Sequence, residues 1–213
     1  MVELTAEIVG STVEPYAAVP TLSLRLRLTE TAGLSVHAIA LRAQVRIEPQ
    51  RRRYSAPEAE RLLELFGETP RWGETLRPFL WTHLSTMVSG FSGTTDVDLP
   101  MTITYDFEVT GAKYLHSLDG GEIPLVVLFS GTVFTKGGAG FVAEPVPWHL
   151  ECNYGLPVAL WREAMDRYFP NSGWMRLARS TIDDLVRFKT AQALPTWDQA
   201  IEALLKQAGE DGS

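Results

Sequence analysis

The histidines and acidic residues in the middle of the chain are the side chains best suited to metal chemistry. His83, His116 and His149 carry imidazole nitrogens, which bind zinc, iron and nickel. Asp106 and Glu108 lie two residues apart, so in a strand they share one face, within the separation of about 5 to 10 Å that paired carboxylates use in glycoside hydrolysis. Neither set has the spacing of a known motif. The simpler interpretations are scattered structural histidines and a carboxylate pair on a solvated strand face. The five residues define an alternative hypothesis, a metal-binding protein or a hydrolase.

Motifs for covalent catalysis and for nucleotide binding are absent from the sequence. Residues 90–93 (GFSG) depart from the G-x-S-x-G pattern of serine hydrolases. The glycine cluster at 136–140 (KGGAG) has neither phosphate-binding pattern and is typical of a turn between strands. Cys152, the single cysteine, has no basic neighbour on its face of a predicted strand to activate it. We therefore identify no catalytic residue and expect no cofactor, which favours a protein that is not an enzyme.

Trp174, Trp197 and the run Arg51, Arg52, Arg53 are the candidate partner-binding residues. Tryptophan and arginine are the side chains that most often anchor protein interfaces, and 15 of the 19 basic residues are arginine. Core packing and a solvated loop explain the same residues without a partner. We nevertheless expect a protein partner, with a homodimer as one form of it.

The charge balance argues against a nucleic-acid partner. The chain carries 19 basic and 26 acidic residues, for a net charge of -7, and the excess lies within residues 81–152, where eight acidic residues face two lysines. Phosphate backbones attract basic surfaces. No window of the sequence is apolar enough to cross a membrane, and the N-terminus lacks a signal-peptide pattern. Together with the single cysteine, these features predict a cytoplasmic protein without a membrane partner.

Apolar and polar residues alternate along several segments, as they do in half-buried strands. The clearest alternations run over 22–28 and 39–47, and the short link between them, with Gly33, predicts an antiparallel hairpin. The further predicted strands bring the total to about seven and cover residues 2–9, 81–88, 101–109, 123–134 and 141–153.

Helix signals occur once inside the strand-rich part and repeatedly near the C-terminus. Ser55, Pro57 and Glu58 form a capping pattern that predicts an inserted helix over 55–67. Three terminal helices are expected to begin near residues 157, 172 and 196.

This order of elements predicts a mainly β, α+β fold. Residues 1–153 are expected to form an antiparallel β-sandwich, with the inserted helix at 55–67, because one apolar sheet face needs a second layer to cover it. Residues 154–213 are expected to form a helical region packed on the sandwich. A single sheet covered by helices is the main alternative.

Three segments carry a resemblance to a known family. VEPYAAVPTL (13–22), WMRL (174–177) and LPTWDQAIEALL (194–205) resemble an uncharacterised bacterial family, a domain of unknown function that covers nearly the whole chain. We associate that family with gene neighbourhoods of nickel-iron hydrogenases. The resemblance implies an accessory or assembly role, and the matched residues are apolar and capping residues to which no catalytic role is transferred.

The expected function is therefore that of a non-catalytic accessory or assembly protein that binds another protein and is associated with hydrogenases. The metal-binding protein or hydrolase remains one alternative. A carrier that holds a small apolar ligand between its sheets is the other.

Overall fold

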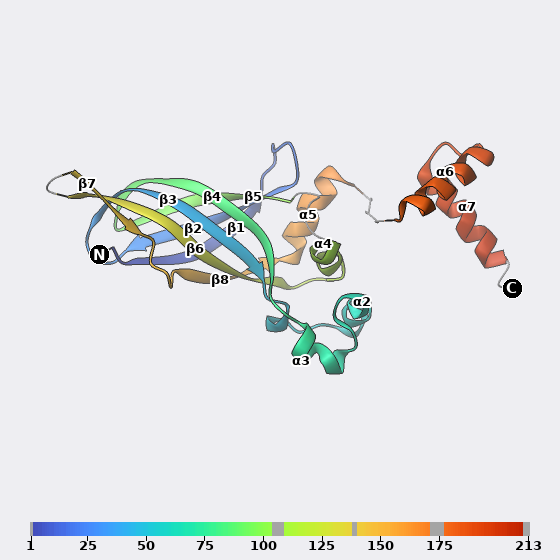
Figure 1. Ribbon diagram of the computed structural model, residues 1–213, viewed down its shortest axis with the longest axis horizontal. Coiled ribbons are helices and arrows are strands. Elements are labelled where there is room, and N and C mark those ends of the chain that lie inside the picture. The colour runs from blue at the N-terminus through green and yellow to red at the C-terminus, as the bar shows by residue number, and fades with distance from the viewer. Residues whose placement is uncertain (1, 104–108, 138–139, 171–176, 211–213) are drawn as a thin grey trace. The chain divides into compact units, whose positions relative to one another are not determined.

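The chain consists of two compact units, Met1–Ser172 and Gly173–Ser213. The structure is a computed structural model (Figure 1), and it describes residues 2–103, 109–137, 140–170 and 177–210. The predicted helical region 154–213 contributes α5 (Val158–Tyr168) to the first unit and two helices to the second. The packing of the second unit's helices on the sandwich stays a prediction.

Eight antiparallel strands form two sheets in the described part of the first unit. One sheet has the order β1-β2-β5, with β1 (Leu4–Val13), β2 (Thr21–Glu30) and β5 (Thr94–Thr102). The other has the order β4-β3-β6-β7, and β8 also pairs with β6. Its strands are β3 (Ser35–Ile47), β4 (Phe79–Ser92), β6 (Glu122–Gly137), β7 (Gly140–Pro145) and β8 (Glu151–Pro157). The predicted mainly β, sandwich-like α+β fold is confirmed, with one strand more than the seven expected.

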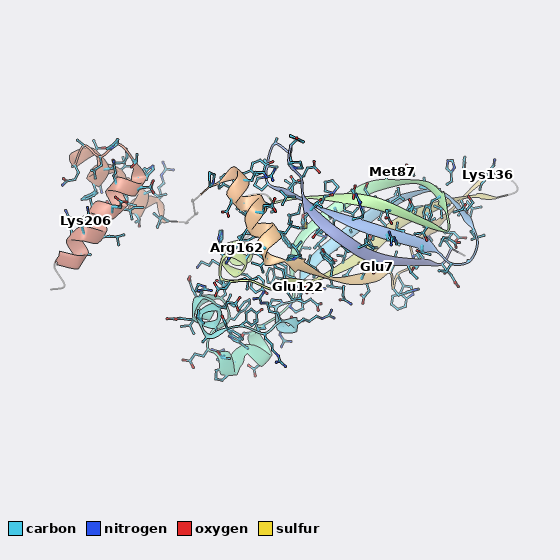
Figure 2. All side chains as sticks on the ribbon, turned by 180° about the vertical axis from the view of Figure 1, so that it is seen from behind. Glu7, Met87, Glu122, Lys136, Arg162 and Lys206 are labelled. Carbon is cyan, nitrogen blue, oxygen red and sulfur yellow. The ribbon has the colours of Figure 1, made fainter. Side chains whose placement is uncertain are left out.

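Alternate residues of the central strands fill the space between the two sheets. These inward residues are Leu22, Leu24, Leu26 and Leu28 on β2 and Ile39, Leu41, Ala43, Val45 and Ile47 on β3, and all are buried. On the outer surface, Glu7 of β1 and Met87 of β4 are exposed, one on each sheet (Figure 2). Because side chains alternate along a strand, the apolar side of each sheet faces the other sheet and both contribute to one core.

The hairpin predicted between residues 22–28 and 39–47 is wrong. β2 pairs with β1 and β5, whereas β3 pairs with β4 and β6, so the short link between them crosses from one sheet to the other. The buried carboxylate of Glu30 orders this link, because it accepts hydrogen bonds from the backbone N–H groups of Ala32 (3.1 Å) and Leu34 (2.7 Å). A link this short fits a hairpin or a crossing equally well, and only the wider pairing distinguishes the two.

Two further predicted strands differ from the structure: one ends earlier than expected, and the other is two separate strands. β5 ends at Thr102 and Val109 begins helix α4 (Val109–His116), so the alternation over 101–109 does not mark one strand, and Asp106 and Glu108 lie outside the described residues. The run 141–153 forms two strands, β7 and β8. Both pair with β6, which at 16 residues is long enough to take them one after the other.

The capping pattern of the inserted helix is confirmed. Ser55 accepts a hydrogen bond from the backbone of Glu58, and the Glu58 side chain accepts one from the backbone N–H of Ser55. The insertion is nevertheless a series of short helical turns rather than one helix. They are η1 (Pro49–Arg51), α1 (Ala56–Arg61), α2 (Leu63–Phe66), η2 (Thr69–Arg71) and α3 (Trp72–Thr75).

Helices α4 and α5 lie side by side at one end of the sandwich (Figure 1). The ring of His116 on α4 meets the ring of Trp161 on α5 edge-on, with centroids 4.9 Å apart. Trp161 and Ala164 are buried, and the Tyr168 hydroxyl donates to the carbonyl of Ala17, in the loop between β1 and β2. α5 therefore closes this end of the core.

The second unit is a helical hairpin of α6 (Arg179–Ala191) and α7 (Trp197–Glu210). The Thr196 hydroxyl accepts a hydrogen bond from the backbone N–H of Gln199 (3.2 Å) and so caps the helix that was predicted to begin near residue 196. Among the described residues of this unit, Ala200 alone is buried. The helical hairpin therefore has almost no interior of its own.

Candidate functional site

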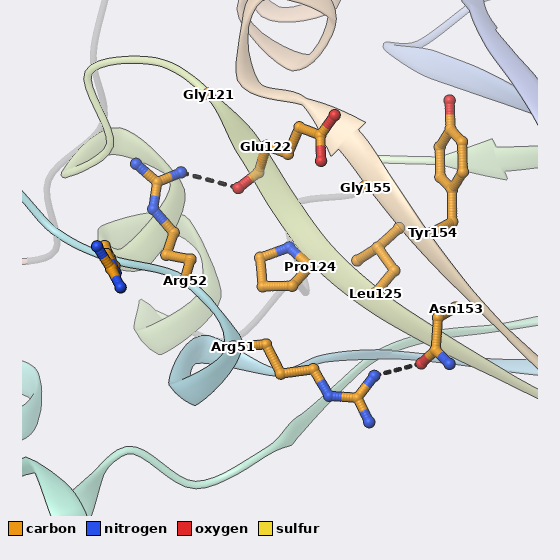
Figure 3. Close-up of a pocket in the computed structure, with 10 residues that line it drawn as sticks. Arg51, Arg52, Gly121, Glu122, Pro124, Leu125, Asn153, Tyr154 and Gly155 are labelled. Carbon is orange, nitrogen blue, oxygen red and sulfur yellow. Dashed lines mark hydrogen bonds between the residues drawn. The ribbon is translucent and has the colours of Figure 1, made fainter.

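The arginine run singled out in the sequence lines the wall of a pocket of 520 Å³ (Figure 3). The pocket lies where the segment after β3 meets the start of β6 and the middle of β8. Its lining residues are Arg51, Arg52, Arg53, Gly121, Glu122, Pro124, Leu125, Asn153, Tyr154 and Gly155. Two glycines and a proline line the pocket together with charged side chains.

Arg52 holds the fold together beside this pocket. Its guanidinium donates to the carbonyl oxygen of Glu122 (2.9 Å) and pairs with the carboxylate of Glu58 (2.5 Å), and its side chain is only 11% exposed. A buried ion pair is costly to break, because the remaining charge loses its partner without regaining water. Arg52 therefore stabilises the fold, and its predicted role in binding a partner stays a prediction.

The Glu58 carboxylate connects two segments of the chain, residues 52–58 and the segment at Asp119. Besides Arg52, it accepts hydrogen bonds from the backbone N–H groups of Ser55 (2.8 Å) and Asp119 (2.9 Å). Burial raises the pKa of this carboxyl, but the two N–H donors and Arg52 outweigh burial, and the pKa lies below its ordinary value. Glu58 is therefore ionised at neutral pH and joins the inserted helices to the residues that precede β6.

Arg51 and Arg53 differ from Arg52 in exposure. Arg51 pairs with Glu48 (2.5 Å) and donates to the side-chain oxygen of Asn153, while its side chain stays half exposed. Arg53 is exposed and has no hydrogen-bond or ion-pair partner within the described ranges. Figure 3 shows the guanidinium ends of Arg51 and Arg52 pointing apart. Arg51 and Arg52 therefore do not converge on one point in the pocket.

A carboxylate also lines the pocket. Glu122 packs over Gly155, where an added Cβ would lie 2.0 Å from Glu122 Oε2, so the glycine makes room for this side chain. With Glu122, Glu48 and Glu58 beside the three arginines, the local charge is balanced. The pocket favours neither an anion nor an apolar ligand, and the prediction of an apolar ligand between the sheets is not tested by it.

The three candidate histidines lie on different elements. His83 is exposed on β4 opposite Gln44, His116 is on α4, and His149 contacts Trp148 in the turn before β8. Burial and the nearby Arg162 lower the pKa of His116. Within the described residues, no group of three or more His, Cys, Asp or Glu side chains could hold a metal ion. The alternative hypothesis of a metal site is therefore supported by the sequence alone. Two of its five candidate residues, Asp106 and Glu108, lie outside the described residues.

The single cysteine is a core residue. Cys152 is buried on β8, and burial raises the pKa of its thiol to about 11. The reactive form of a cysteine is the thiolate, so this environment makes Cys152 unreactive at neutral pH.

The helical hairpin exposes an apolar surface that we call the hairpin face. It consists of Ile182 and Val186 on α6 and of Trp197 and Leu205 on α7, which are 42%, 44%, 46% and 67% exposed. The two stripes adjoin, because the ammonium of Lys189, one turn beyond Val186, lies 5.6 Å from the ring centroid of Trp197. Of the two candidate tryptophans, Trp197 belongs to this face and Trp174 lies outside the described residues.

Part of the hairpin face was missed in the sequence. Leu185 and Phe188 of α6 are half-buried and do not belong to the hairpin face. Other apolar residues recur every four positions and mark the exposed stripe: Ile182 and Val186 on α6, and Trp197, Ile201 and Leu205 on α7. This second stripe could have been found in the sequence. One apolar stripe on each helix is enough to explain the contact between the two helices, so the second stripe is easily overlooked.

The fold defines a mainly β, sandwich-like α+β protein with a C-terminal helical hairpin, and no helix in the described ranges has the length and apolar character needed to cross a membrane. The chain belongs to DUF6084, a family of unknown function whose model matches residues 1–213. No protein with a curated description matches the chain.

Two solved structures show distant similarity. A selenomethionine-labelled β-glucosidase from Kluyveromyces marxianus matches 72% of this chain at 8% identity with a TM-score of 0.28, and this chain spans 15% of it. The second structure is a protein from Bordetella pertussis that is assigned the name ApaA. The match covers 73% of this chain and 94% of the ApaA chain at 11% identity, with a TM-score of 0.24. Scores this low carry no inference about fold or function.

Proposed function

We propose that this chain is a non-catalytic accessory or assembly protein that acts by binding protein, and that the hairpin face is its docking surface. The observation that carries the proposal is the contrast between two amphipathic helices and the single residue, Ala200, that is buried in the described part of their unit. We also propose a cytoplasmic location, which the single cysteine, a buried and free thiol, supports.

The physical basis is the cost of ordering helices without a core. α6 has 13 residues and α7 has 14, and helices shorter than about 12 to 15 residues are marginal in water unless an apolar face is buried. Units below about 40 residues generally need a cross-link, a metal or a partner to stay folded. An additional apolar surface that covers the hairpin face would supply the missing burial.

Two matched double variants of the full chain test the docking surface. Val186→Glu with Leu205→Glu places two charges on the hairpin face, whereas Ser180→Glu with Gln199→Glu adds the same charge at exposed positions on the opposite sides of the two helices. We expect the first variant to lose protein association and the second to keep it. The readout is affinity capture with the tagged chain at physiological salt, followed by mass spectrometry.

Hydrogenase maturation proteins are the first partners to test, because of the family resemblance. Capture that is equal for both double variants and the unaltered chain would contradict the proposal, since the hairpin face would then play no part in association. Circular dichroism of both variants is the control that their helices still form.

A further inference from the structure

We propose that the outer face of the five-stranded sheet binds an extended acidic segment of another protein through two arginines, Arg42 and Arg46. Both lie on β3, which runs between β4 and β6 (Figure 1). Ala43 and Val45 of β3 point into the core, so the two arginines point outward. We call this pair the arginine stripe. It lies wholly in the first unit and is a binding surface that does not depend on the hairpin face.

The arginines on the outer face of the three-stranded sheet are already paired with acidic neighbours. The Nε atom of Arg25 lies 3.0 Å from the Asp98 carboxylate across the strand pair. The Nε atom of Arg27 lies 2.8 Å from the Asp96 carboxylate. In each pair a second guanidinium nitrogen donates to the other carboxylate oxygen. The charges of these four side chains therefore cancel within the fold.

The arginine stripe has no such acidic neighbours. The cross-strand neighbours of Arg42 are Ser85 on β4 and Ser130 on β6, and those of Arg46 are apolar. Arg42 is exposed and Arg46 is partly exposed. Within the described ranges, neither guanidinium has a hydrogen-bond or ion-pair partner. Two charged donor groups on one strand are thus left for a ligand.

Two carboxylates lie near the arginine stripe in the strand register. Glu48, two residues beyond Arg46, is paired with Arg51 at 2.5 Å. Glu151 is in the same cross-strand row as Gln44, but it lies on β8, two strands away from β3. Two strand spacings amount to about 10 Å, which is beyond the reach of an ion pair. The arginine stripe therefore keeps its positive charge.

The two serines beside Arg42 make this position suited to an oxyanion. They flank the arginine on both sides, and directly opposed residues on neighbouring strands lie about 5 Å apart. Both are exposed, and in the described part of the chain neither hydroxyl has a hydrogen-bond partner. A carboxylate accepts hydrogen bonds from a guanidinium in a two-pronged manner and has lone pairs left for a hydroxyl. Ser85, Arg42 and Ser130 together offer such a set of donors.

The spacing of the arginine stripe indicates what kind of anion it fits. Arg42 and Arg46 are four residues apart on one strand, which is about 13 Å, and they share one side. An extended segment that lies along β3 repeats this spacing, so carboxylates four residues apart reach both guanidinium groups. Arginine clusters are a recurring means of recognising acidic motifs. A single phosphate group would contact only one of the two arginines.

The net charge of the chain favours a short acidic segment over an extended polyanion. Beyond a Debye length of about 8 Å, exposed charges are largely screened, so a short segment responds to the local arginines. A nucleic acid or an anionic membrane covers a larger surface and is repelled by the net charge of -7. The ligand that fits both the charge and the spacing is therefore a carboxylate-rich peptide segment.

Nuclear magnetic resonance of the ¹⁵N-labelled full chain tests the proposal. The probe is a synthetic peptide with two glutamates four residues apart and threonines between them. We expect the Nε–H signals of Arg42 and Arg46 to shift, with a dissociation constant on the order of 1 mM. A peptide with the two glutamates adjacent should bind about threefold more weakly, because it reaches one arginine at a time. A peptide with glutamines in their place should not bind.

Two matched double variants separate the arginine stripe from general charge. Arg42→Gln with Arg46→Gln should weaken binding of the peptide about tenfold, and each single substitution about threefold. Arg25→Gln with Arg27→Gln removes the same charge from the outer face of the other sheet and should bind as the unaltered chain does. The amide spectrum of each variant checks that the sandwich is folded.

Three results would overturn the proposal. No shift at about 10 mM peptide would mean that the arginine stripe is a solvated surface. Equal weakening in both double variants would mean that the peptide responds only to net charge. If inorganic phosphate or vesicles of anionic phospholipid shift the Arg42 and Arg46 signals more strongly than the peptide does, the ligand is a phosphate group and not a carboxylate segment. Val186→Glu with Leu205→Glu should bind the peptide normally, so the outcome here is measured separately from that of the hairpin face.

Discussion

The sandwich unit and the helical hairpin bury their apolar side chains to very different extents. In the described residues, every buried apolar side chain except Ala200 belongs to the first unit. The sandwich also contains a buried ion pair, Arg52 with Glu58, and a buried carboxylate, Glu30, that accepts backbone hydrogen bonds. The helical hairpin has an exposed ion pair, Arg187 with Asp184, and an exposed apolar face.

This difference separates the part of the chain that contains a core from the part whose apolar side chains stay exposed. A sandwich with one continuous core gains its stability from the area it removes from water. Under the proposed function, the helical hairpin gains such stability by burying its apolar face against a partner. The proposal therefore assigns the stable fold to the first unit and the docking surface to the second.

The largest effect on stability is expected at the buried ion pair of the sandwich. Glu58→Gln leaves the Arg52 guanidinium buried without a charged partner, and we expect a loss of about 3 to 5 kcal/mol in the free energy of unfolding. Urea unfolding followed by tryptophan fluorescence measures it. Glu60→Gln, exposed on the same helix, is the control and should change the value by less than about 0.5 kcal/mol. If both variants lose equally little, the pair does not hold this part of the fold together.

A leucine in each unit tests the contrast directly. Leu24→Ala creates a cavity in the sandwich core and should cost about 3 kcal/mol, whereas Leu205→Ala removes an exposed side chain and should cost less than about 0.5 kcal/mol in the same unfolding transition of the dilute monomer. Equal losses at low protein concentration would mean that Leu205 is part of the core that unfolds with the sandwich.

Acidification should affect the sandwich through its two buried carboxylates. Burial alone would raise the pKa of Glu30, but the N–H groups of Leu34 and Ala32 lower it below its ordinary value of 4.5, as happens also for Glu58. Such groups stabilise the fold above pH 4.5, and their contribution is lost as the pH falls through the lowered values.

Glu30→Gln should therefore be less stable than the unaltered chain at pH 7. It should also lose less stability between roughly pH 5 and pH 2, the range over which carboxylates titrate. Near-ultraviolet circular dichroism during acid titration measures this. Glu7→Gln, exposed on β1, should leave the acid transition unchanged. An identical titration curve for Glu30→Gln would show that Glu30 does not contribute to acid sensitivity.

The smallest effect on the sandwich is expected from removing the helical hairpin. A chain that ends at Ser172 should unfold at the same temperature as the full chain when both are dilute, because the core lies in the first unit. Differential scanning calorimetry provides the measurement. A clear drop in the unfolding temperature would break the comparison, since the second unit would then support the first.

Local patterns accounted for most of the elements. The period-two leucines of β2, the capping residues Ser55 and Glu58, and the cap at Thr196 all occupy the predicted structures, because each depends only on neighbours a few residues away. The strand predicted over 101–109 ended early because an alternation of apolar residues does not indicate where pairing stops.

The candidate site was predicted less completely. The arginine run was identified as a unit, yet the structure gives its three members different roles, since Arg52 is buried against Glu58 and Arg53 is exposed. Trp197 was identified, whereas Ile182, Val186 and Leu205 were not. The separation of His83, His116 and His149 depends on where β4, α4 and the turn before β8 lie in space, which spacing along the chain does not reveal.

The sequence by itself determined the class of the fold, the positions of most strands and the ends of several helices, because alternation, helical period and capping are properties of adjacent residues. Only the tertiary structure decided that β2 and β3 belong to different sheets, that β6 takes both β7 and β8, and that Glu58 joins Arg52 to the backbone of Asp119. These choices depend on pairings between residues far apart in the chain. The free energy of such pairings comes from burial and hydrogen bonding in the assembled core, and no local pattern contains it.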